Sequence, residues 1–364
     1  MRVGVIYNEP KQTTAERHWI SRSESQGVNV AEDFVDSSEY DVVRQAKRIE
    51  NILNEAGFDT VLYAASDPSR LCGFLLQERP DLIFNCCETL GGNSNLEMNV
   101  AALYELLNIP FTGTSALGIA LANDKGVAKS LFRNHGVPTP SWQTFATGSE
   151  IVPQEFSFPA IVKPVHEDAS IGIDLNSIVE DPSSLAERVR WVWKEFGQPA
   201  LAEEFIDGRE FNVTLLASPG GELCALPISE IVFDGFPNDK YRIVTFAAKW
   251  MSDSPQFATT VPRCPADVPP ELEKIVQSLA VKAAEAVRMR DYGRIDFRVR
   301  ASSDEVFVTE ANPNPDLNED AGLARSARAS GRTYPGLIRE IFDRAIDRCT
   351  KNPAAHESRP TFQL

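Results

Sequence analysis

The first third of the chain alternates apolar strands with helices, and this order restricts the fold more than any other feature. Strand and helix follow one another over residues 3–7, 40–56, 58–63, 68–78, 81–87 and 95–107. Parallel strands need long crossover connections, and crossover helices cover both faces of the sheet. The pattern therefore predicts an α/β domain built on a parallel sheet. Residues 8–38 are polar and poorly periodic, which indicates an extended loop or lid.

Composition limits the classes of protein and partner that fit this chain. Its 364 residues favour roughly two or three globular domains. No apolar run is long enough to cross a membrane and no signal peptide precedes the first strand, so we expect a cytoplasmic protein. Six cysteines without a CxxC pair and four scattered histidines argue against disulfides and a zinc site. The net charge of −16 argues against nucleic acid as a partner, but a few converging cations would still bind a small polyphosphate.

The rest of the chain is richer in antiparallel strands. Further helices are predicted at residues 124–135, 184–196, 271–288 and 335–347. Further strands are predicted at residues 160–163, 200–205, 211–217, 226–233, 292–300 and 305–312. The last two strands flank a short polar turn, which is typical of a hairpin.

This last hairpin carries acids and an amide on one face. We expect Phe307 to share the apolar face of Phe297. With side chains alternating between the two faces, this assignment places Glu310 and Asn312 on the same face as Asp296. Opposed carboxylates about 5 Å apart repel one another unless a cation lies between them. Their oxygens are the ligands that Mg²⁺ takes, but a solvated face with arginine–glutamate pairs is an equally weighted alternative.

Three lysines are candidates for binding a polyphosphate. Lys163 ends an apolar strand and precedes a proline, which aims its side chain. The small-residue loop at 166–173 follows, and its backbone N–H groups would cover a phosphate, although an ordinary turn has a similar sequence. Lys129 lies on a predicted helix, where a solvated face is the usual explanation. Lys249 follows a polar segment and fits a closing loop.

In combination, these features are far more specific than any one of them. The motifs, in chain order, are Asp124-Lys…Lys129, Ile161-Val-Lys-Pro164, Ser170-Ile-Gly-Ile173, Glu203-Glu-Phe-Ile-Asp-Gly-Arg-Glu210, Lys249-Trp250, Gly293-Arg-Ile-Asp296 and Glu310-Ala-Asn312. The series resembles the ATP-grasp superfamily, and within it the D-alanine–D-alanine ligases and their ligase-like relatives. The resemblance covers about residues 1–345. It implies an N-terminal Rossmann-like parallel α/β domain and two α+β subdomains that clamp the nucleotide, with boundaries at 1–120, 121–204 and 205–348 and a tail at 349–364.

The resemblance also implies a role for each motif residue. The residues expected to bind ATP are Lys129, Lys163, Ser170, Glu203, Glu204, Ile206, Glu210 and Lys249. Two Mg²⁺ ions, or Mn²⁺, would be ligated by Asp296, Glu310 and Asn312. Arg294 would steady an acyl phosphate, Lys249 would reach the γ-phosphate from a mobile loop, and the backbone N–H of Asp316 would face an oxyanion.

The implied reaction joins small carboxylate and amine substrates in two steps. A carboxylate attacks the γ-phosphorus of ATP, which gives an acyl phosphate and ADP, and an amine then displaces phosphate to form an amide. Carboxylate and γ-phosphate are both anions, so cations must neutralise them where they meet. A homodimer is also implied by the resemblance.

The sequence departs from D-alanine–D-alanine ligases proper around both substrates. Residues 7–17 replace a glycine-rich stretch, and residues 85–93 differ from a histidine-bearing loop. After the expected metal ligands, Asp316, Glu319 and Asp320 form an acidic rim. This rim favours an amine substrate with an extra amino group or without a carboxylate there, at even odds with a solvated loop.

Three other functions remain open at this point. One is a catalytically inactive nucleotide-binding regulatory subunit, which the full set of Arg294, Asp296, Glu310 and Asn312 disfavours. Another is a true D-alanine–D-alanine ligase of cell-wall synthesis. The third is a kinase or carboxylase built on the same fold.

Overall fold

The N-terminal part is built on a parallel sheet, as its strand–helix order predicted. A computed structural model of the protein describes residues 1–9, 32–148, 150, 156–235, 241–251 and 253–351. The sheet has the order β2-β1-β3, with β1 at Arg2–Asn8, β2 at Asp59–Ala65 and β3 at Leu82–Cys86. Its helices are α2 (Glu32–Glu55), α3 (Pro68–Glu78) and α4 (Glu97–Leu106), the last preceded by a 3₁₀ turn at Ser94–Leu96. The α/β prediction is therefore confirmed.

Helix α2 begins earlier than the sequence pattern suggested. The predicted loop at 8–38 ends at Glu32, where the helix starts, and residues 10–31 of that loop lie outside the described residues. Polarity and poor periodicity had suggested a loop as far as residue 38, whereas the backbone is helical from Glu32 onward.

A second, antiparallel sheet occupies the middle of the chain. Its order is β4-β7-β5-β6, with β4 at Trp142–Phe145, β5 at Ala160–Pro164, β6 at Ile178–Val179 and β7 at Ala200–Glu204. Helices α5 (Ala116–Asn123) and α6 (Lys125–Asn134) precede it, and α7 (Pro182–Phe196) packs on it after a 3₁₀ turn at Leu175–Ser177. Helix α7 starts at the capping residue Asp181 and ends at Gly197, whose φ of 64° suits glycine.

The third sheet has six strands and holds the predicted hairpin. Its order is β11-β10-β8-β12-β13, and β9 pairs with β8. The strands are β8 (Gly208–Ala217), β9 (Leu223–Ala225), β10 (Ser229–Phe233), β11 (Thr260–Arg263), β12 (Tyr292–Arg300) and β13 (Val306–Asn312). The helices are α8 (Phe246–Trp250), α9 (Pro255–Thr259), α10 (Pro270–Ala286), α11 (Gly322–Ala329) and α12 (Tyr334–Lys351). None of the helices in the described ranges is long and apolar enough to cross a membrane.

The hairpin β12–β13 contains a β-bulge that corrects one prediction. Asp296 pairs with Glu310, but Phe297 pairs with Val308 rather than Phe307, because the register shifts between Asp296 and Phe297. The prediction that Phe307 shares the apolar face of Phe297 is therefore wrong, and Val308 fills that place. Two residues of β13 oppose one position of β12, so the alternation of faces is interrupted. Glu310 still lies opposite Asp296 as predicted.

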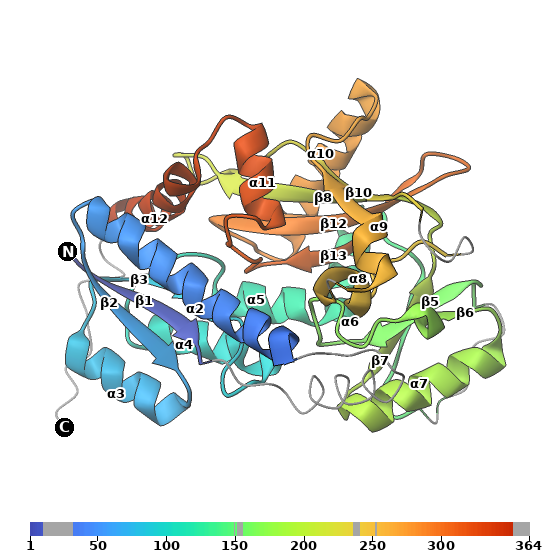
Figure 1. Ribbon diagram of the computed structural model, residues 1–364, viewed down its shortest axis with the longest axis horizontal. Helices are drawn as coiled ribbons and strands as arrows, with labels where there is room; N and C mark the ends of the chain where they lie inside the picture. The colour runs from blue at the N-terminus through green and yellow to red at the C-terminus, as the bar shows by residue number, and fades with distance from the viewer. Residues whose placement is uncertain (10–31, 149, 151–155, 236–240, 252, 352–364) are drawn as a thin grey trace.

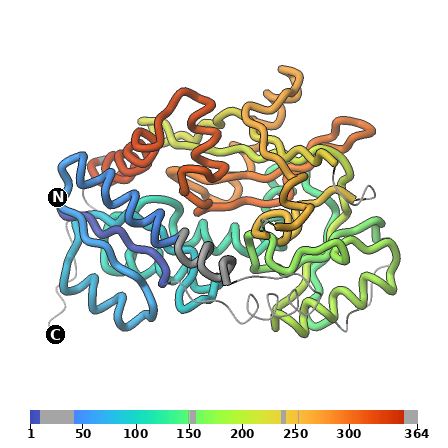
Figure 2. The backbone as a smooth tube through the Cα atoms, viewed as in Figure 1, coloured from blue at the N-terminus to red at the C-terminus, as the bar shows by residue number. Residues whose placement is uncertain are grey.

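The N-terminal and C-terminal sheets share one hydrophobic core. Val5 and Phe84 from the first sheet belong to the same buried cluster as Leu216 and Tyr292 from the third sheet and Phe342 from α12. Figures 1 and 2 show α12 beside α2 and the first sheet, with the middle sheet at the opposite end of the molecule. Each sheet lies within one predicted domain range, and the domain boundaries themselves stay a prediction.

Polar contacts reinforce the same joint. The buried carboxylate of Asp291 accepts a 2.8 Å hydrogen bond from the Gly113 N–H, and Arg290 Nε donates to the Gly113 carbonyl at 2.7 Å. Arg348 of α12 donates to the Phe111 carbonyl at 2.6 Å and also pairs with Asp291. The end of the first α/β unit is therefore fixed directly to the start of β12.

Candidate active site

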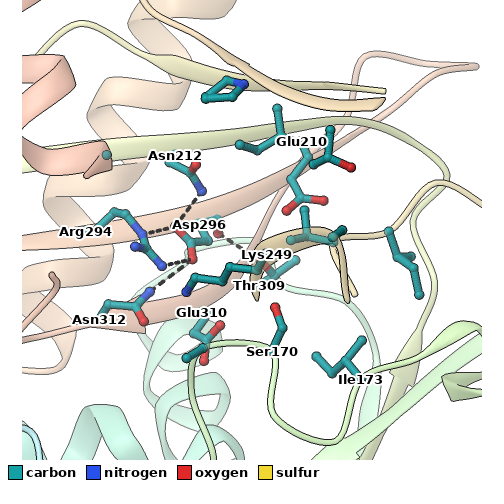
Figure 3. Close-up of a pocket in the computed structure, with 18 of the residues that line it drawn as sticks. Ser170, Ile173, Glu210, Asn212, Lys249, Arg294, Asp296, Thr309, Glu310 and Asn312 are labelled. Carbon is teal, nitrogen blue, oxygen red and sulfur yellow. Dashed lines mark hydrogen bonds and ion pairs between the residues drawn. The ribbon is translucent and has the colours of Figure 1, made fainter. Parts of the chain in front are cut away.

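A cavity of about 740 Å³ is lined by residues from the middle and the C-terminal sheets. It brings together almost every residue for which the sequence predicted a role. The predicted residues that line it are Lys163, Ser170, Glu203, Glu204, Ile206, Glu210, Lys249, Arg294, Asp296, Glu310, Asn312 and Asp316. Figure 3 shows many of these side chains converging from separate strands and loops. Lys129 is the exception and does not line the cavity.

Asp296 lies in a dense set of donors on the floor of the cavity. Arg294 approaches it with two nitrogens, Nε at 2.7 Å and Nη2 at 2.8 Å, while Asn212 donates at 2.8 Å and Asn312 at 3.1 Å (Figure 3). Burial alone would lower the pKa of Arg294, but the charge of Asp296 outweighs it and raises that pKa. Since Asn312 turns its amide nitrogen toward Asp296, its amide oxygen is left for another partner. Asn212 was not predicted, because it belongs to the neighbouring strand β8.

Glu310 is held by a lysine that the sequence left without a role. Lys125 Nζ lies 3.0 Å from Glu310 Oε1 and 3.1 Å from Asp168 Oδ1, and it donates to the Glu167 carbonyl at 2.6 Å. Burial acts to raise the pKa of Glu310, but the charge of Lys125 outweighs it and lowers that pKa. One buried ammonium therefore joins the floor of the cavity to the loop at 166–173. The signal in the sequence was the Asp124-Lys125 pair, which only the motif match had singled out.

The loop at 166–173 is fastened on three sides. Its carbonyl at His166 accepts from Ser94 at 3.2 Å, its carbonyl at Ala169 accepts from Trp250 Nε1 at 2.9 Å, and its carbonyl at Ile173 accepts from the Phe246 N–H at 3.0 Å. Ala169 and Ser170 both have positive φ, at 56° and 64°. Such a backbone is costly for residues other than glycine and is held by its surroundings. These contacts fix the backbone of the loop, and its role in covering a phosphate stays a prediction.

Lys249 of α8 projects into the cavity toward the floor residues (Figure 3). The enclosing protein and the nearby charge of Arg294 lower its pKa. Within the described parts of the chain, no carboxylate lies within ion-pair distance of its ammonium. A cation in this position is suited to an anionic ligand that enters the cavity.

At the other end of the cavity, Glu203 binds two lysines at once. Its Oε1 lies 2.7 Å from Lys163 Nζ and its Oε2 lies 2.5 Å from Lys129 Nζ. Glu203 is 2% exposed and Lys129 is 1% exposed, so Lys129 lies behind Glu203 and also contacts Thr139. Burial lowers the pKa of Lys129 to about 8, against the charge of Glu203. Lys129 and Lys125 are one turn apart on α6, and both are buried. The alternative that Lys129 lies on a solvated helix face is therefore wrong.

Arg298 organises the segment that joins the two sheets. It lies 2.7 Å from Glu210 Oε2 and donates at 3.0 Å to the carbonyls of Ile206 and Arg242. Burial raises the pKa of Glu210, although Arg298 opposes this. Among the described residues, none accepts a hydrogen bond from the Ile206 N–H, which therefore remains available at the cavity wall. The sequence analysis gave Arg298 no role, because its partners lie on distant segments.

The rim at 316–320 is less acidic than the sequence suggested. Asp316 Oδ1 accepts two hydrogen bonds from Asn318, at 2.8 and 2.9 Å. Arginines border the rest of the loop: Arg325 donates to the Asp320 carbonyl at 2.9 Å, Arg328 donates to the Glu319 carbonyl at 2.5 Å, and Arg48 lies 3.8 Å from Glu319. The prediction of an acidic rim was incomplete because these arginines come from α2 and α11.

Two further acids come from the N-terminal unit: Glu88 belongs to the segment at 85–93 that departs from the expected histidine-bearing loop, and Glu97 begins α4. Glu97 accepts from Asn123 at 2.7 Å and from Asn314 at 3.2 Å, and burial raises its pKa to about 8. Burial and the charge of Asp316 raise the pKa of Glu88 to about 8 as well. Sequence patterns did not single out either acid, because their surroundings depend on contacts with distant segments.

Comparisons with known proteins relate the sequence and the fold of this chain to one family. A family model described as the C-terminus of D-ala D-ala ligase matches residues 131–343. An uncharacterized protein of Sinorhizobium fredii is 33% identical over 308 residues, which cover 82% of this chain and 87% of the relative. The D-alanine–D-alanine ligase of Bordetella avium is 31% identical over 82% of this chain and 91% of its own length. A crystal structure of the D-alanine–D-alanine ligase from Bacillus anthracis complexed with ATP aligns with a TM-score of 0.70 at 20% identity, over 97% of this chain and 99% of that one.

Proposed function

The chain belongs to the D-alanine–D-alanine ligase family of ATP-grasp proteins, and from that premise we propose how its cavity carries out an ATP-dependent ligation. It is an ATP-dependent ligase that forms an amide bond between small amino-acid-like substrates through an acyl phosphate. The observation that supports the residue assignments is the convergence on one cavity of twelve residues to which the resemblance gave a role, which are Lys163, Ser170, Glu203, Glu204, Ile206, Glu210, Lys249, Arg294, Asp296, Glu310, Asn312 and Asp316.

The nucleotide would lie along the seam between the middle and C-terminal sheets. The Ile206 N–H and the backbone of Glu204 face the adenine edge, and Glu210 binds the ribose hydroxyls. Lys163 and the N–H groups of the loop around Ser170 contact the phosphates. Glu203 is already shared by two lysines, so its main task is to fix Lys163, while its remaining lone pairs accept the adenine amino group.

The donor set on the floor fits a divalent cation. Asp296, Glu310 and the free amide oxygen of Asn312 are hard oxygen ligands on one face of β12–β13. Within the described ranges no three acidic, histidine or cysteine side chains are placed to hold a metal ion, so the amide is needed to complete the set. When bound, Mg²⁺ or Mn²⁺ would supply positive charge at the phosphate oxygens. Two such ions are part of the proposal.

The protein's own residues would guide both steps of the reaction. A carboxylate oxygen of the first substrate attacks the γ-phosphorus, and the bond to ADP breaks. Arg294 and Lys249 neutralise the anions that meet there. The amine of the second substrate then attacks the acyl carbon, loses a proton and expels phosphate, while the N–H of Asp316 stabilises the oxyanion. The loop at 166–173, fastened by Trp250, keeps water from the acyl phosphate.

A screen of carboxylate and amine pairs, with ADP release and product mass as readouts, tests this function. In Lys163→Ala, turnover should fall by about 10²–10³-fold, as for the loss of one donor to a transition state. Asp296→Asn should still bind ADP in a titration but should release no product. The matched control is Lys194→Ala, on the exposed face of α7, which should behave as wild type. Normal turnover in both site variants would contradict the assignments.

The alternative functions make different predictions. A regulatory subunit would bind nucleotide without product, and the intact set of Arg294, Asp296 and Glu310 disfavours it. A true D-alanine–D-alanine ligase would prefer D-alanine as both substrates in the same screen. The homodimer and the cytoplasmic location expected from the sequence stay predictions.

A further inference from the structure

We propose that Asn314 and Gln45 are positioning residues for the second step of the reaction, because they tie the loop that carries Asp316 to the first α/β unit. This loop, residues 313–317, follows β13 and is called the transfer loop below. The inference rests on the proposed ligase function, in which the Asp316 N–H stabilises the oxyanion. Asp316 lines the cavity, and among the described residues none accepts a hydrogen bond from its N–H.

The transfer loop cannot take its position from a sheet. Strand β13 ends at Asn312, so the loop lies beyond the last strand pair of the hairpin. Pro313 and Pro315 belong to the loop, and a proline has no backbone N–H to donate. The position of the Asp316 N–H therefore depends on the side chains and the few backbone groups that connect the loop to other segments.

Asn314 makes the first connection, and it uses both ends of its amide. Its Nδ2 donates to the Cys87 carbonyl at 2.9 Å and to Glu97 Oε1 at 3.2 Å, and its Oδ1 accepts from the Tyr292 hydroxyl at 2.9 Å. All three partners are buried. Cys87 follows β3 and Glu97 begins α4, so the side of the loop that precedes Asp316 is tied to the first α/β unit.

Gln45 makes the second connection, on the other side of Asp316. The Leu317 N–H donates to Oε1 of this buried residue of α2 at 3.1 Å, and the Leu317 carbonyl accepts from the Tyr334 hydroxyl at 2.9 Å. Asp316 therefore lies between two anchors, and both lead to the first α/β unit. Because a displacement of about 1 Å in a reacting group can slow a reaction by about a hundredfold, these anchors would control the rate at which the oxyanion forms.

The anchors are separate from the residues proposed to bind adenosine. Glu204 belongs to β7 and Glu210 to β8, whereas the partners of Asn314 and Gln45 lie in the first α/β unit, at the start of β12 and in the transfer loop itself. Loss of an anchor should therefore leave nucleotide binding and the formation of the acyl phosphate intact, and it should slow only the attack of the amine.

Single-turnover kinetics with rapid quenching separate the two steps. Full-length protein in excess over ATP is mixed with the carboxylate and amine pair that gives the fastest turnover in the screen, and ADP and amide are measured over time. In Asn314→Leu and in Gln45→Met, ADP should form at the wild-type rate, whereas amide should form about tenfold to a hundredfold more slowly. The affinity for ADP should not change. A mere loss of folded protein would lower the amounts of both products equally and leave their rates alone.

Two controls distinguish the hydrogen bonds of Asn314 from other effects. Glu97→Gln should form amide at close to the wild-type rate, because the new side chain can still accept from Asn314 and can donate to Asn123 Oδ1, which is buried without a partner among the described residues. Asn99→Leu, on the exposed side of α4, should also behave as wild type.

The outcomes separate this inference from the ligase function. Wild-type rates of amide formation in both anchor variants, or an equal slowing of ADP and amide, would overturn the inference while the ligase function stands. A loss in Glu97→Gln as large as that in Asn314→Leu would overturn it as well, since the charge of Glu97 would then matter rather than the hydrogen bond. Failure of the wild-type protein to form amide from any pair would overturn both proposals.

Discussion

Replacement of Lys129 by methionine would measure the energetic cost of burying a charged lysine behind Glu203. Lys129 is 1% exposed, and burial lowers its pKa from 10.5 to about 8 even with Glu203 2.5 Å away. The folded protein therefore holds this proton less tightly than the unfolded chain does. At about 1.36 kcal/mol per pKa unit, the difference between 10.5 and about 8 corresponds to about 3 kcal/mol.

The sign of the effect follows from which state loses the proton first. Below about pH 8 both states are protonated, and the folded state carries the whole penalty of about 3 kcal/mol. As the pH rises from about 8 to about 10.5, the folded state loses the proton while the unfolded chain keeps it, so stability increases. The free energy of unfolding of wild type, minus that of Lys129→Met, should therefore rise by about 3 kcal/mol across this window.

Urea unfolding between about pH 7.5 and about pH 10.5 would measure this difference. Tryptophan fluorescence is a suitable probe, because the ring of Trp142 lies 5.9 Å from Lys129 Nζ. Titrating groups that do not interact with Lys129 occur unchanged in both proteins and cancel in the subtraction. The control is Lys274→Met, at a side chain that is 72% exposed, and its difference from wild type should stay flat. A flat or falling difference for Lys129→Met would refute the reasoning.

Three further outcomes are expected from contacts around the cavity. Arg298→Gln removes the partner of Glu210 and of the Ile206 carbonyl, so ADP affinity should fall by about tenfold or more in a calorimetric titration; unchanged affinity would contradict the adenosine placement. Trp250→Phe removes the 2.9 Å hydrogen bond to the loop at 166–173, so ADP release without coupled product should increase, and unaltered coupling would show that the loop closes without it. The lowered pKa of Lys249 means that its charge is lost at a lower pH than that of an ordinary lysine, so kcat/KM for ATP should decline on the alkaline side; Lys249→Arg should lack this decline.

Sequence reasoning succeeded where a chemical group lies at a predictable place on a strand. The acids of β12 and β13, the lysine that ends β5 and the segment after β7 all flank regular strands, so their order along the chain predicts a common site. The α/β order of the first sheet could also be predicted from the sequence, because the spacing of apolar residues distinguishes strands from helices.

Prediction from the sequence failed where a local irregularity or a distant segment determines where a side chain lies. Thr309 lies within the register shift of the hairpin, and the extra residue moves Val308 rather than Phe307 into the core. No pattern of alternating residues contains that shift. The sequence favoured a surface position for Lys129, because the pattern of its helix contains no information about its ion pair with Glu203 of another strand. The arginine of α2 that faces Glu319 is more than 270 residues away in the chain, beyond the reach of any local pattern.

The shared core of the first and third sheets has a consequence for how this chain can be divided. Phe58 of the N-terminal unit lies against Phe342 of α12, with ring centroids 4.8 Å apart, and Val5 and Phe84 belong to the same cluster. A fragment that stops near residue 120 would expose this apolar surface to water and lack the residues that should cover it. Recombination between relatives would therefore have to exchange the beginning and the end of the chain together, while the middle sheet, which has its own core, is the natural interchangeable piece.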